Sequence, residues 1–340
     1  MFVKGVVFVG DRRLELVEFA DPKPGPGEVV LRIMASGMCG SDLHPYRAES
    51  PPECIAGHEP SGIVEEVGVG VSAHMAQVGD RVTVHHYAGC NACDQCRSGW
   101  FQLCRAGTVR YGADANGSHS AYMLVPAVTL VKLPDRMTFT SGATIGCGTG
   151  TAWGGLKRLG DLNGMDLLVS GQGPVGLSAT MIASSQGARV IAVDVQASRL
   201  ELAKKFGAAE VVDASDVDVA VAVRELTCGV GAPRVLETSG SSGASEAALK
   251  CLSTWGRACF LGLGGGSFEV DVSKLLTTQA TLMTSWTLSI AELQRCVDFV
   301  GRRCLPVDDL FTSRWRLDDA EAAYAHFDQQ SAGKGVFIFD

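Results

Sequence analysis

Four cysteines lie close together at positions whose spacing is typical of metal ligands. They are Cys90, Cys93, Cys96 and Cys104. Short Cys-x-x-Cys steps bring sulfur atoms together with little loop closure, and Gly89 and Asn91 suit the tight turns that this requires. Four thiolates form the tetrahedral set of a structural zinc site, which leaves no position for a substrate. An iron–sulfur cluster is the alternative, although the spacing differs from the ferredoxin runs.

Three further potential ligands are widely separated along the chain. They are Cys39, His58 and Cys147. A single cysteine or histidine is more often a packing residue than a ligand, so the interpretation depends on the three acting together. Two thiolates and one imidazole hold zinc with a fourth position open, which is the arrangement of a catalytic metal. We therefore expect a second zinc site that can take a substrate.

A glycine-rich motif of the type G-x-G-x-x-G lies in the second half of the chain. Its six residues are Gly171, Gln172, Gly173, Pro174, Val175 and Gly176. The motif follows an expected strand at 166–170 and opens an expected helix, a context that predicts a dinucleotide-binding turn. The first glycine would permit the tight turn, the second would let the backbone approach the pyrophosphate, and the third would let helix and strand pack closely. The helix N-terminus would offer N–H groups to the phosphates.

The next expected strand ends at Asp194, which favours NAD as the cofactor. Its carboxylate would accept hydrogen bonds from the adenosine ribose and would repel the 2′-phosphate of NADP. Arg199 lies five residues further on and would favour that phosphate instead. The alternative interpretation is an ordinary glycine turn and a helix-capping aspartate.

Two different patterns of apolar residues along the chain indicate two domains. Residues 1–149 contain short apolar or alternating runs, such as 29–33 and 80–84, separated by Gly/Pro clusters, and this predicts a β-rich, loop-rich domain. Over 150–290, apolar strands alternate with helical segments, which predicts a doubly wound parallel sheet covered on both faces. The tail, 291–340, contains two expected helices and a strand. Because a lone strand leaves its backbone groups unpaired, we expect the tail to fold with 1–149.

Composition excludes several classes of protein. The chain has 340 residues with a net charge of −8, and 46% of them are apolar. The length suggests about two domains, the acidic balance argues against a nucleic-acid binder, and the apolar content argues against disorder. No apolar run reaches the roughly 18 residues of a membrane span, and no signal peptide is visible, so a soluble cytoplasmic protein without a membrane partner is expected.

Taken together, the motifs resemble those of the zinc-dependent medium-chain alcohol dehydrogenases over nearly the whole chain. They are CGSDLH at 39–44, GHEPSG at 57–62, GDRV at 79–82, the four cysteines, GCG at 146–148 and GQGPVG at 171–176. The resemblance implies a GroES-like catalytic domain over 1–149 and 291–340 and a Rossmann-type NAD-binding domain over 150–290. It further implies NAD, two zinc ions per chain (one catalytic, one structural), and a homodimer or homotetramer.

The resemblance also implies roles for individual side chains. Zinc on Cys39, His58 and Cys147 would bind the alcohol oxygen and lower its pKa, and the alcohol carbon would pass a hydride to the nicotinamide. Ser41 would hydrogen-bond that oxygen, and His44 would complete the proton relay as a general base.

The neighbours of these residues have less specific roles. Asp42 would orient His58. Glu59 either supports the zinc or is an occasional ligand of it, or it is the acid of a structural salt bridge.

The resemblance also shows a difference at Gly40. Many relatives have a basic residue there that binds the pyrophosphate, so other residues of this chain would have to bind that phosphate. Cys147 matches the alcohol dehydrogenases, whereas the polyol and threonine branches usually have a carboxylate there.

The sequence therefore predicts NAD-dependent, reversible oxidation of primary or secondary alcohols to aldehydes or ketones. A polyol or amino-alcohol dehydrogenase, of the sorbitol or threonine type, is the alternative. A second, remote alternative is a catalytically silent protein that binds zinc and a dinucleotide. Tyr46, His86 and Trp286 are candidates to line the pocket for a small-molecule substrate, although ordinary packing is the simpler explanation for each of them.

Overall fold

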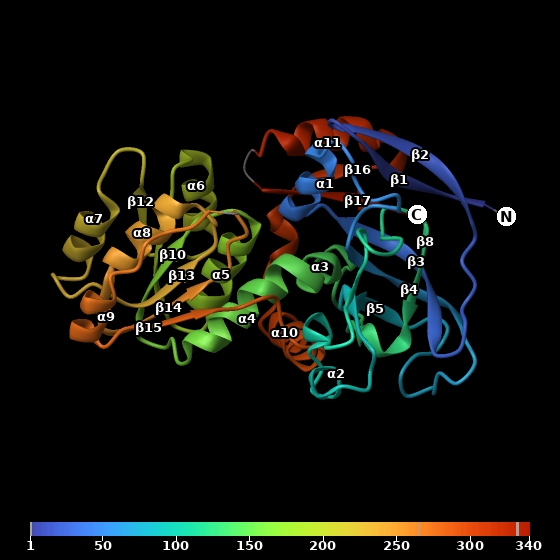
Figure 1. Ribbon diagram of the computed structural model, residues 1–340, viewed down its shortest axis with the longest axis horizontal. Helices are drawn as coiled ribbons and strands as arrows, with labels where there is room; N and C mark the ends of the chain where they lie inside the picture. The colour runs from blue at the N-terminus through green and yellow to red at the C-terminus, as the bar shows by residue number, and fades with distance from the viewer. Residues whose placement is uncertain (1, 265, 331–332) are drawn as a thin grey trace. The chain divides into compact units, whose positions relative to one another are not determined.

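The chain folds into two compact units. The computed structural model describes residues 2–264, 266–330 and 333–340 (Figure 1). The first unit comprises Met1–Cys147 with Ser289–Asp340, and the second comprises Gly148–Leu288. The sequence placed the two domain boundaries at 149/150 and 290/291, which is two residues further along the chain in each case. Within the described ranges, no helix has the length and apolar character needed to span a membrane.

A seven-stranded sheet forms the centre of the first unit. Its order is β16–β17–β3–β4–β5–β9, with β8 also paired to β3. The strands are β3 (Glu28–Gly37), β4 (Glu59–Val67), β5 (Arg81–Val84), β8 (Tyr122–Pro126), β9 (Leu130–Lys132), β16 (Phe311–Trp315) and β17 (Lys334–Ile338). Strand β17 runs antiparallel to β3, with Val336 opposite Gly37. The C-terminal tail thus completes the sheet formed by the N-terminal half of the chain.

Shorter elements and two longer helices surround this sheet. They are the hairpin β1 (Phe2–Gly10) and β2 (Arg13–Ala20), the short pair β6 (Tyr87–Ala88) and β7 (Val109–Arg110), and the helices α1 (Leu43–Arg47), α2 (Asp94–Arg97), α3 (Phe139–Thr144), α10 (Ile290–Arg303) and α11 (Ala320–Asp328). Helix α10 begins where the Ser289 side chain accepts the Glu292 N–H. It buries Leu293, Val297 and Val300 at helical spacing, which is the pattern that made this helix predictable.

The second unit is a six-stranded parallel sheet in the order β12–β11–β10–β13–β14–β15. The strands are β10 (Asp166–Ser170), β11 (Arg189–Asp194), β12 (Glu210–Asp213), β13 (Ala232–Glu237), β14 (Leu252–Phe260) and β15 (Thr281–Thr284). The helices are α4 (Gly150–Leu159), α5 (Pro174–Ser185), α6 (Ala197–Lys205), α7 (Val219–Leu226), α8 (Ser242–Lys250) and α9 (Val272–Thr278). Helices α4 and α5 lie on one face of the sheet and α7 and α8 on the other (Figure 1). This confirms the predicted doubly wound fold.

Helix α9 and strand β16 were not expected from the sequence, for identifiable reasons. Helix α9 has only seven residues, and its three apolar residues, Val272, Leu275 and Leu276, are too few to distinguish a helix from a short strand. Strand β16 has only five residues and follows directly after a turn of 3-10 helix at Val307–Leu310. Its pairing with β17 is long-range and has no local signal.

A chain of buried polar side chains connects α11 to the central sheet of the first unit. Ser36 Oγ lies 2.8 Å from His119 Nδ1, and His119 Nε2 lies 2.7 Å from the Tyr324 hydroxyl oxygen. All three residues are fully buried. Burial lowers the pKa of His119 to about 4. The imidazole is therefore neutral in the folded protein at neutral pH.

This neutral imidazole should make the protein sensitive to acid. The pKa of histidine in an unfolded chain is about 6.5. Between that value and about 4, the unfolded state binds a proton that the folded state does not, so stability falls as the pH falls. We expect wild-type protein to lose about 2 kcal/mol more of its unfolding free energy than His119→Asn between about pH 7 and about pH 5. Denaturant titrations of both zinc-loaded proteins measure the difference.

Tyr324→Phe is the matched control, because it removes one hydrogen bond of His119 and leaves the imidazole able to titrate. It should be less stable than wild type at both pH values and keep the pH dependence. Equal pH dependence in wild type and His119→Asn would contradict the prediction.

Candidate functional site

Strand pairing in the first unit brings two of the predicted metal ligands together. Cys39 follows the end of β3, and His58 immediately precedes β4. The two strands are antiparallel neighbours, with Gly37 opposite Glu59. Cys147 lies in a single stretch of π-helix, Ile145–Thr149, a local irregularity that is common at functional sites.

The geometry of these three side chains fits a tetrahedral zinc ion. Cys39 Sγ lies 3.8 Å from Cys147 Sγ, and Cys147 Sγ lies 3.5 Å from His58 Nε2. Zinc–sulfur bonds of about 2.3 Å and zinc–nitrogen bonds of about 2.0–2.1 Å at tetrahedral angles separate two sulfurs by about 3.8 Å and sulfur from nitrogen by about 3.6 Å. Both separations from Cys147 Sγ thus already match the spacing that a zinc ion would impose, and all three donor atoms lie within 4.8 Å of one another.

The protonation of the two thiols supports the same interpretation. Contact with the Cys147 thiol holds the pKa of Cys39 well below its usual range, whereas contact with Cys39 and burial raise the pKa of Cys147. The two sulfurs therefore share one proton. A divalent cation at this position would displace that proton, because only the thiolate is a ligand.

Asp42 orients two parts of this cluster. One carboxylate oxygen, Oδ1, lies 2.8 Å from His58 Nδ1, and the other accepts the backbone N–H of Cys39 at 2.8 Å. Because Asp42 binds Nδ1, His58 presents Nε2 to the sulfurs. Burial lowers the pKa of His58, but Asp42 and Cys39 raise it by more, so the net shift is well upward.

A buried ion pair adjoins the cluster, and its cation, Lys334, was not expected from the sequence. Lys334, at the start of β17, places Nζ 2.6 Å from Glu59 Oε1, and both side chains are almost fully buried. A carboxylate oxygen of Glu59 lies within 4.8 Å of the ligand atoms of Cys39, His58 and Cys147. Burial raises the pKa of Glu59 to about 7. The salt bridge and the position beside the metal ligands, which had been alternatives for Glu59, are both present.

Ser41 and His44 differ in their closeness to the cluster. Ser41 Oγ lies 3.2 Å from Cys39 Sγ and 3.4 Å from His58 Nε2. The side chain of Ser41 can therefore reach an oxygen held beside these atoms. His44 is exposed in α1, three residues further along.

The three predicted pocket residues have different surroundings. His86 is buried beside His58, with ring centroids 5.0 Å apart. Trp286 follows β15 in the second unit and is 46% exposed. The prediction for Tyr46 is wrong, because its ring is buried in the core between Phe8 and Tyr324. Side chains two residues apart in a helix point to roughly opposite sides, so closeness to His44 in sequence did not place Tyr46 in a pocket.

One nitrogen of His86 is available to a ligand. His86 Nδ1 lies 2.9 Å from the carbonyl oxygen of Gly146. A carbonyl can only accept, so Nδ1 carries the proton and Nε2 is an acceptor. Within the described ranges nothing hydrogen-bonds that Nε2. Burial also lowers the pKa of His86 well below its usual value, which keeps the ring neutral.

The four clustered cysteines form a separate loop site around α2. Cys90 Sγ lies 4.0 Å from Cys96 Sγ, and the backbone N–H of Cys90 points to Cys104 Sγ at 3.3 Å. The backbone N–H groups of Cys96 and Arg105 lower the pKa of Cys93 to about 6. A Cβ on Gly89 would collide with Cys96 Sγ, so the loop closes around the sulfurs only with glycine there. The pKa of Cys90 is also lowered by backbone N–H groups, and four converging thiols of this kind fit a structural zinc ion.

The glycine-rich turn leaves the carboxyl end of β10, at the point where the strand order changes direction. Gly171 has φ +88°, and a Cβ on Gly176 would collide with the Gly171 carbonyl oxygen. A Cβ on Gly173, in contrast, would meet nothing within 4 Å. The protein itself does not require this glycine, and the open space fits the approach of a pyrophosphate to the backbone. Pro174 and Val175 open helix α5.

Asp194 is fixed beside this turn at the end of β11. Its two oxygens accept the backbone N–H groups of Gln172 at 2.6 Å and Gln196 at 2.9 Å. Arg199 Nη1 lies 3.7 Å from Asp194 Oδ2. The carboxylate thus connects the glycine-rich turn to the strand that precedes α6.

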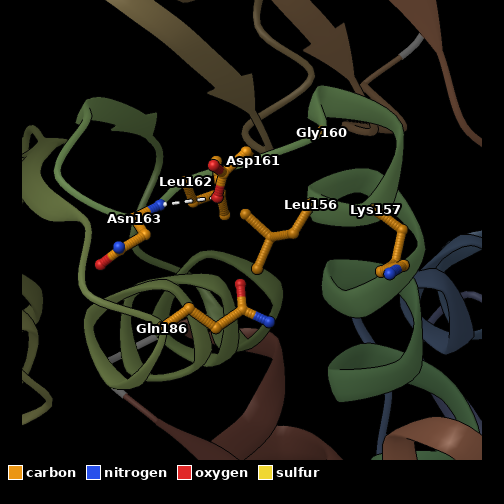
Figure 2. Close-up of a pocket in the computed structure, with 7 residues that line it drawn as sticks. All are labelled: Leu156, Lys157, Gly160, Asp161, Leu162, Asn163 and Gln186. Carbon is orange, nitrogen blue, oxygen red and sulfur yellow. Dashed lines mark hydrogen bonds between the residues drawn. The ribbon is translucent and has the colours of Figure 1, made fainter.

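A surface pocket of the second unit lies away from this turn. Figure 2 shows its lining residues, which are Leu156, Lys157, Gly160, Asp161, Leu162, Asn163 and Gln186. The loop that contains Asn163 enters β10 at its amino end, whereas the glycine-rich turn leaves from its carboxyl end. Nucleotides bind at the carboxyl ends of parallel strands. The pocket in Figure 2 is therefore not the dinucleotide site.

Comparisons with known proteins agree with this geometry. Residues 25–135 match the family model "Alcohol dehydrogenase GroES-like domain", and residues 174–302 match "Zinc-binding dehydrogenase". The chain is 36% identical, over 97% of both chains, to the "uncharacterized zinc-type alcohol dehydrogenase-like protein YphC" of Escherichia coli (strain K12). It is 34% identical to the L-threonine 3-dehydrogenase of Pyrococcus horikoshii, over 95% of this chain and 94% of that one. Alcohol dehydrogenase TADH from Thermus sp. ATN1 superimposes with a TM-score of 0.93 at 28% identity, over 98% of this chain and 99% of that one.

The hydrogen bond from His58 to Asp42 gives a testable prediction. Asp42→Asn keeps the size of the side chain and removes the charge that holds His58, so zinc affinity at the Cys39–His58–Cys147 cluster should fall about 10–100-fold. Competition with a chelator of known zinc affinity measures this loss. Asp114→Asn, which changes an aspartate paired with Arg110 at the surface, is the control and should leave the affinity unchanged. An unaltered affinity in Asp42→Asn would mean that Asp42 does not orient the ligand.

Proposed function

The chain belongs to the zinc-type alcohol dehydrogenase family, and from that premise we propose that its substrate is a small primary or secondary alcohol, oxidised reversibly to an aldehyde or ketone with NAD. It is an oxidoreductase that acts on CH–OH groups and uses a nicotinamide cofactor and zinc. The observation that carries the proposal is the spacing of the Cys39, His58 and Cys147 donor atoms, which matches zinc, with the Ser41 hydroxyl alongside.

The residues of the first unit have separate roles in this reaction. Zinc held by Cys39, His58 and Cys147 supplies Lewis acidity, which lowers the pKa of an alcohol. Ser41 would accept the alcohol proton on its hydroxyl oxygen while passing its own proton on, and the exposed His44 would release that proton to solvent. A bound nicotinamide would supply the acceptor for the hydride and thus for the two electrons that the alcohol loses.

We assign NAD rather than NADP as the cofactor. Asp194 is held at the end of β11 by two backbone N–H groups, so its carboxylate stays where a ribose would lie. Arg199, the residue that favoured NADP, is paired with that carboxylate at 3.7 Å. Its charge is thereby partly offset, and the fixed negative charge of Asp194 disfavours a 2′-phosphate.

The alternative of an amino-alcohol or polyol substrate is supported by His86. Its free Nε2 is an acceptor beside the metal cluster, where it would bind a second hydroxyl or an ammonium group on the substrate. The L-threonine 3-dehydrogenase relatives favour the same class. Cys147 favours a simple alcohol instead, because the polyol and threonine branches usually have a carboxylate at that position.

We also propose two zinc ions per chain and a homo-oligomer, a dimer or tetramer. Two clusters of ligand-type side chains occur among the described residues, which supports the two ions. Strand β15 lies at an edge of the parallel sheet, and the adjoining helix α9 exposes Val272 and Leu276, which supports pairing with a second copy at this edge. All 12 cysteines are free, which supports an expected location in the reducing cytoplasm.

A substrate panel tests the proposed reaction. Zinc-loaded protein should form NADH with at least one simple or aromatic alcohol, and kcat/KM should be higher with NAD than with NADP. Ser41→Ala, as the matched variant, should retain zinc and lose about 10²–10⁴-fold in kcat, which is the usual contribution of a positioned proton acceptor. Turnover of polyols or threonine alone would favour the second candidate. No turnover of any alcohol would support a catalytically silent protein.

The structural zinc is tested by Cys104→Ser. We expect this variant to bind one zinc ion instead of two and to unfold at a temperature roughly 5 °C or more below wild type, because a structural metal contributes directly to folding. Metal analysis and thermal melts measure both effects. Cys228→Ser, which changes an exposed cysteine outside both clusters, should match wild type in both measurements. A Cys104→Ser variant with normal stability and two zinc ions would contradict the assignment.

A further inference from the structure

Two arginines lie opposite each other on β13 and β14, neighbouring strands in the parallel sheet of the second unit (Figure 1). Arg234 is in register with Arg257, and the preceding register pair is Ala232 with Leu252. One residue separates the two pairs in β13, whereas residues 253–256 separate them in β14. This bulge in β14 sets the arginines opposite each other. Register partners on adjacent strands lie about 4.8 Å apart and point to the same face, so the two guanidinium groups are close together.

Neither arginine has a carboxylate partner within residues 2–264, 266–330 and 333–340. In the same ranges, the Arg234 side chain donates only to the carbonyl oxygen of Pro233, and its Nε is buried without a partner. Burial and the charge of Arg257 both lower the pKa of Arg234. Like charges at opposing positions of a sheet are destabilising. The pair therefore costs folding free energy as long as no anion neutralises it.

Arg189 shows how the same sheet neutralises another arginine. This residue begins β11, at the same end of the sheet, and it binds Asp166 and Glu210 at 3.1 Å each. One arginine thus has two acidic partners, while the Arg234–Arg257 pair has none in the described part of the chain. The chain has a net charge of −8, so acidic residues are not scarce. The lack of a counter-charge is a local property of this pair.

The end of helix α4 offsets only part of this positive charge. Arg257 Nη1 lies close to Gly160, the residue that ends α4, because a Cβ on Gly160 would be 3.1 Å from that nitrogen. The carboxyl end of a helix carries about half a negative charge, which is too little to neutralise two guanidinium groups. The last turn of α4 adds two further cations, Lys157 and Arg158. A surplus of positive charge therefore remains beside the pair.

We propose that Arg234 and Arg257 form a binding site for an oxyanion, the phosphate or carboxylate group of a small molecule. Guanidinium groups bind such oxygens through two parallel N–H···O bonds, so one anion between them would neutralise the pair and give Arg234 Nε an acceptor. Gly160, next to Arg257, also lines the pocket of Figure 2, whose volume of about 330 Å³ has room for the rest of a small molecule. The site is distinct from the dinucleotide turn, which leaves the opposite end of β10.

Calorimetric titration of the zinc-loaded protein tests this site, with inorganic phosphate and succinate as probes at constant ionic strength. Saturating NAD keeps the probes away from the glycine-rich turn. Wild type should bind at least one probe with a dissociation constant in the millimolar range or below, as expected for two charge-assisted contacts. Tighter binding of phosphate would identify a phosphate ligand, and tighter binding of succinate a carboxylate ligand. If neither probe binds more tightly than chloride, the proposal is overturned.

Two variants remove one guanidinium each. Arg234→Met and Arg257→Met should both bind the preferred probe at least about tenfold more weakly than wild type, because each lacks a charged donor. In buffer without the probes, both should melt at no lower a temperature than wild type, because the repulsion between like charges is gone. Arginines with a purely structural role would give lower melting temperatures and unchanged affinity for the probes, and that result would overturn the proposal.

Arg234→Glu places a carboxylate opposite Arg257 and so supplies a negative charge from the chain itself. Without the probes it should melt at a higher temperature than wild type, and neither probe should bind; this variant carries the test if the methionine variants do not fold. Binding as tight as that of wild type would contradict the site. Arg189→Met is the matched control, because Arg189 already has two acidic partners at the same end of the sheet. It should bind both probes as wild type does.

Discussion

The antiparallel pairing of β3 with β4 is the constraint on which the metal site depends. The register sets Gly37 opposite Glu59, and this single pairing places Cys39 just beyond one strand end and His58 just before the other. A slip of one residue would turn the side chains of the slipped strand to the opposite face of the sheet, so the ligands would no longer converge. The edge of β3 opposite β4 is also paired, with β8 along Glu28–Arg32 and with β17 along Ala35–Gly37, which supports the register. The C-terminal tail is therefore part of the metal site's framework.

The buried charges around this strand end are organised as successive pairs. Asp42 binds His58 and the backbone of Cys39, Lys334 binds Glu59, and the two cysteines share a proton that a metal would displace. Each pair removes one cause of instability, since an unpaired charge in the interior is costly. The pairs also fix direction, because each charged group points toward its partner. A metal at this point would meet ligands whose orientations the protein has already set.

The sequence predicts well those features that depend on neighbouring residues. The glycine-rich turn and the four-cysteine loop are local, and in each one glycine is explained by a contact within the same segment, Gly176 by the Gly171 carbonyl oxygen and Gly89 by Cys96 Sγ. The parallel sheet of the second unit follows from apolar strands that alternate with helices. Cys39, His58 and Cys147 have no common local pattern, so their grouping rested on their ligand chemistry and on the resemblance to a family. Tyr46 was misplaced because closeness in sequence does not determine which way a side chain points.

Lys334 could not have been predicted from the sequence in the same way. It is separated from Glu59 by 275 residues, and nothing around either residue indicates the other. A lysine near the C-terminus reads as a surface residue, since lysine is almost never fully buried unless it is paired. Its partner, Glu59, had two possible roles, and both are present in the structure. The cation of this buried pair comes from the opposite end of the chain, where only the folded sheet reveals it.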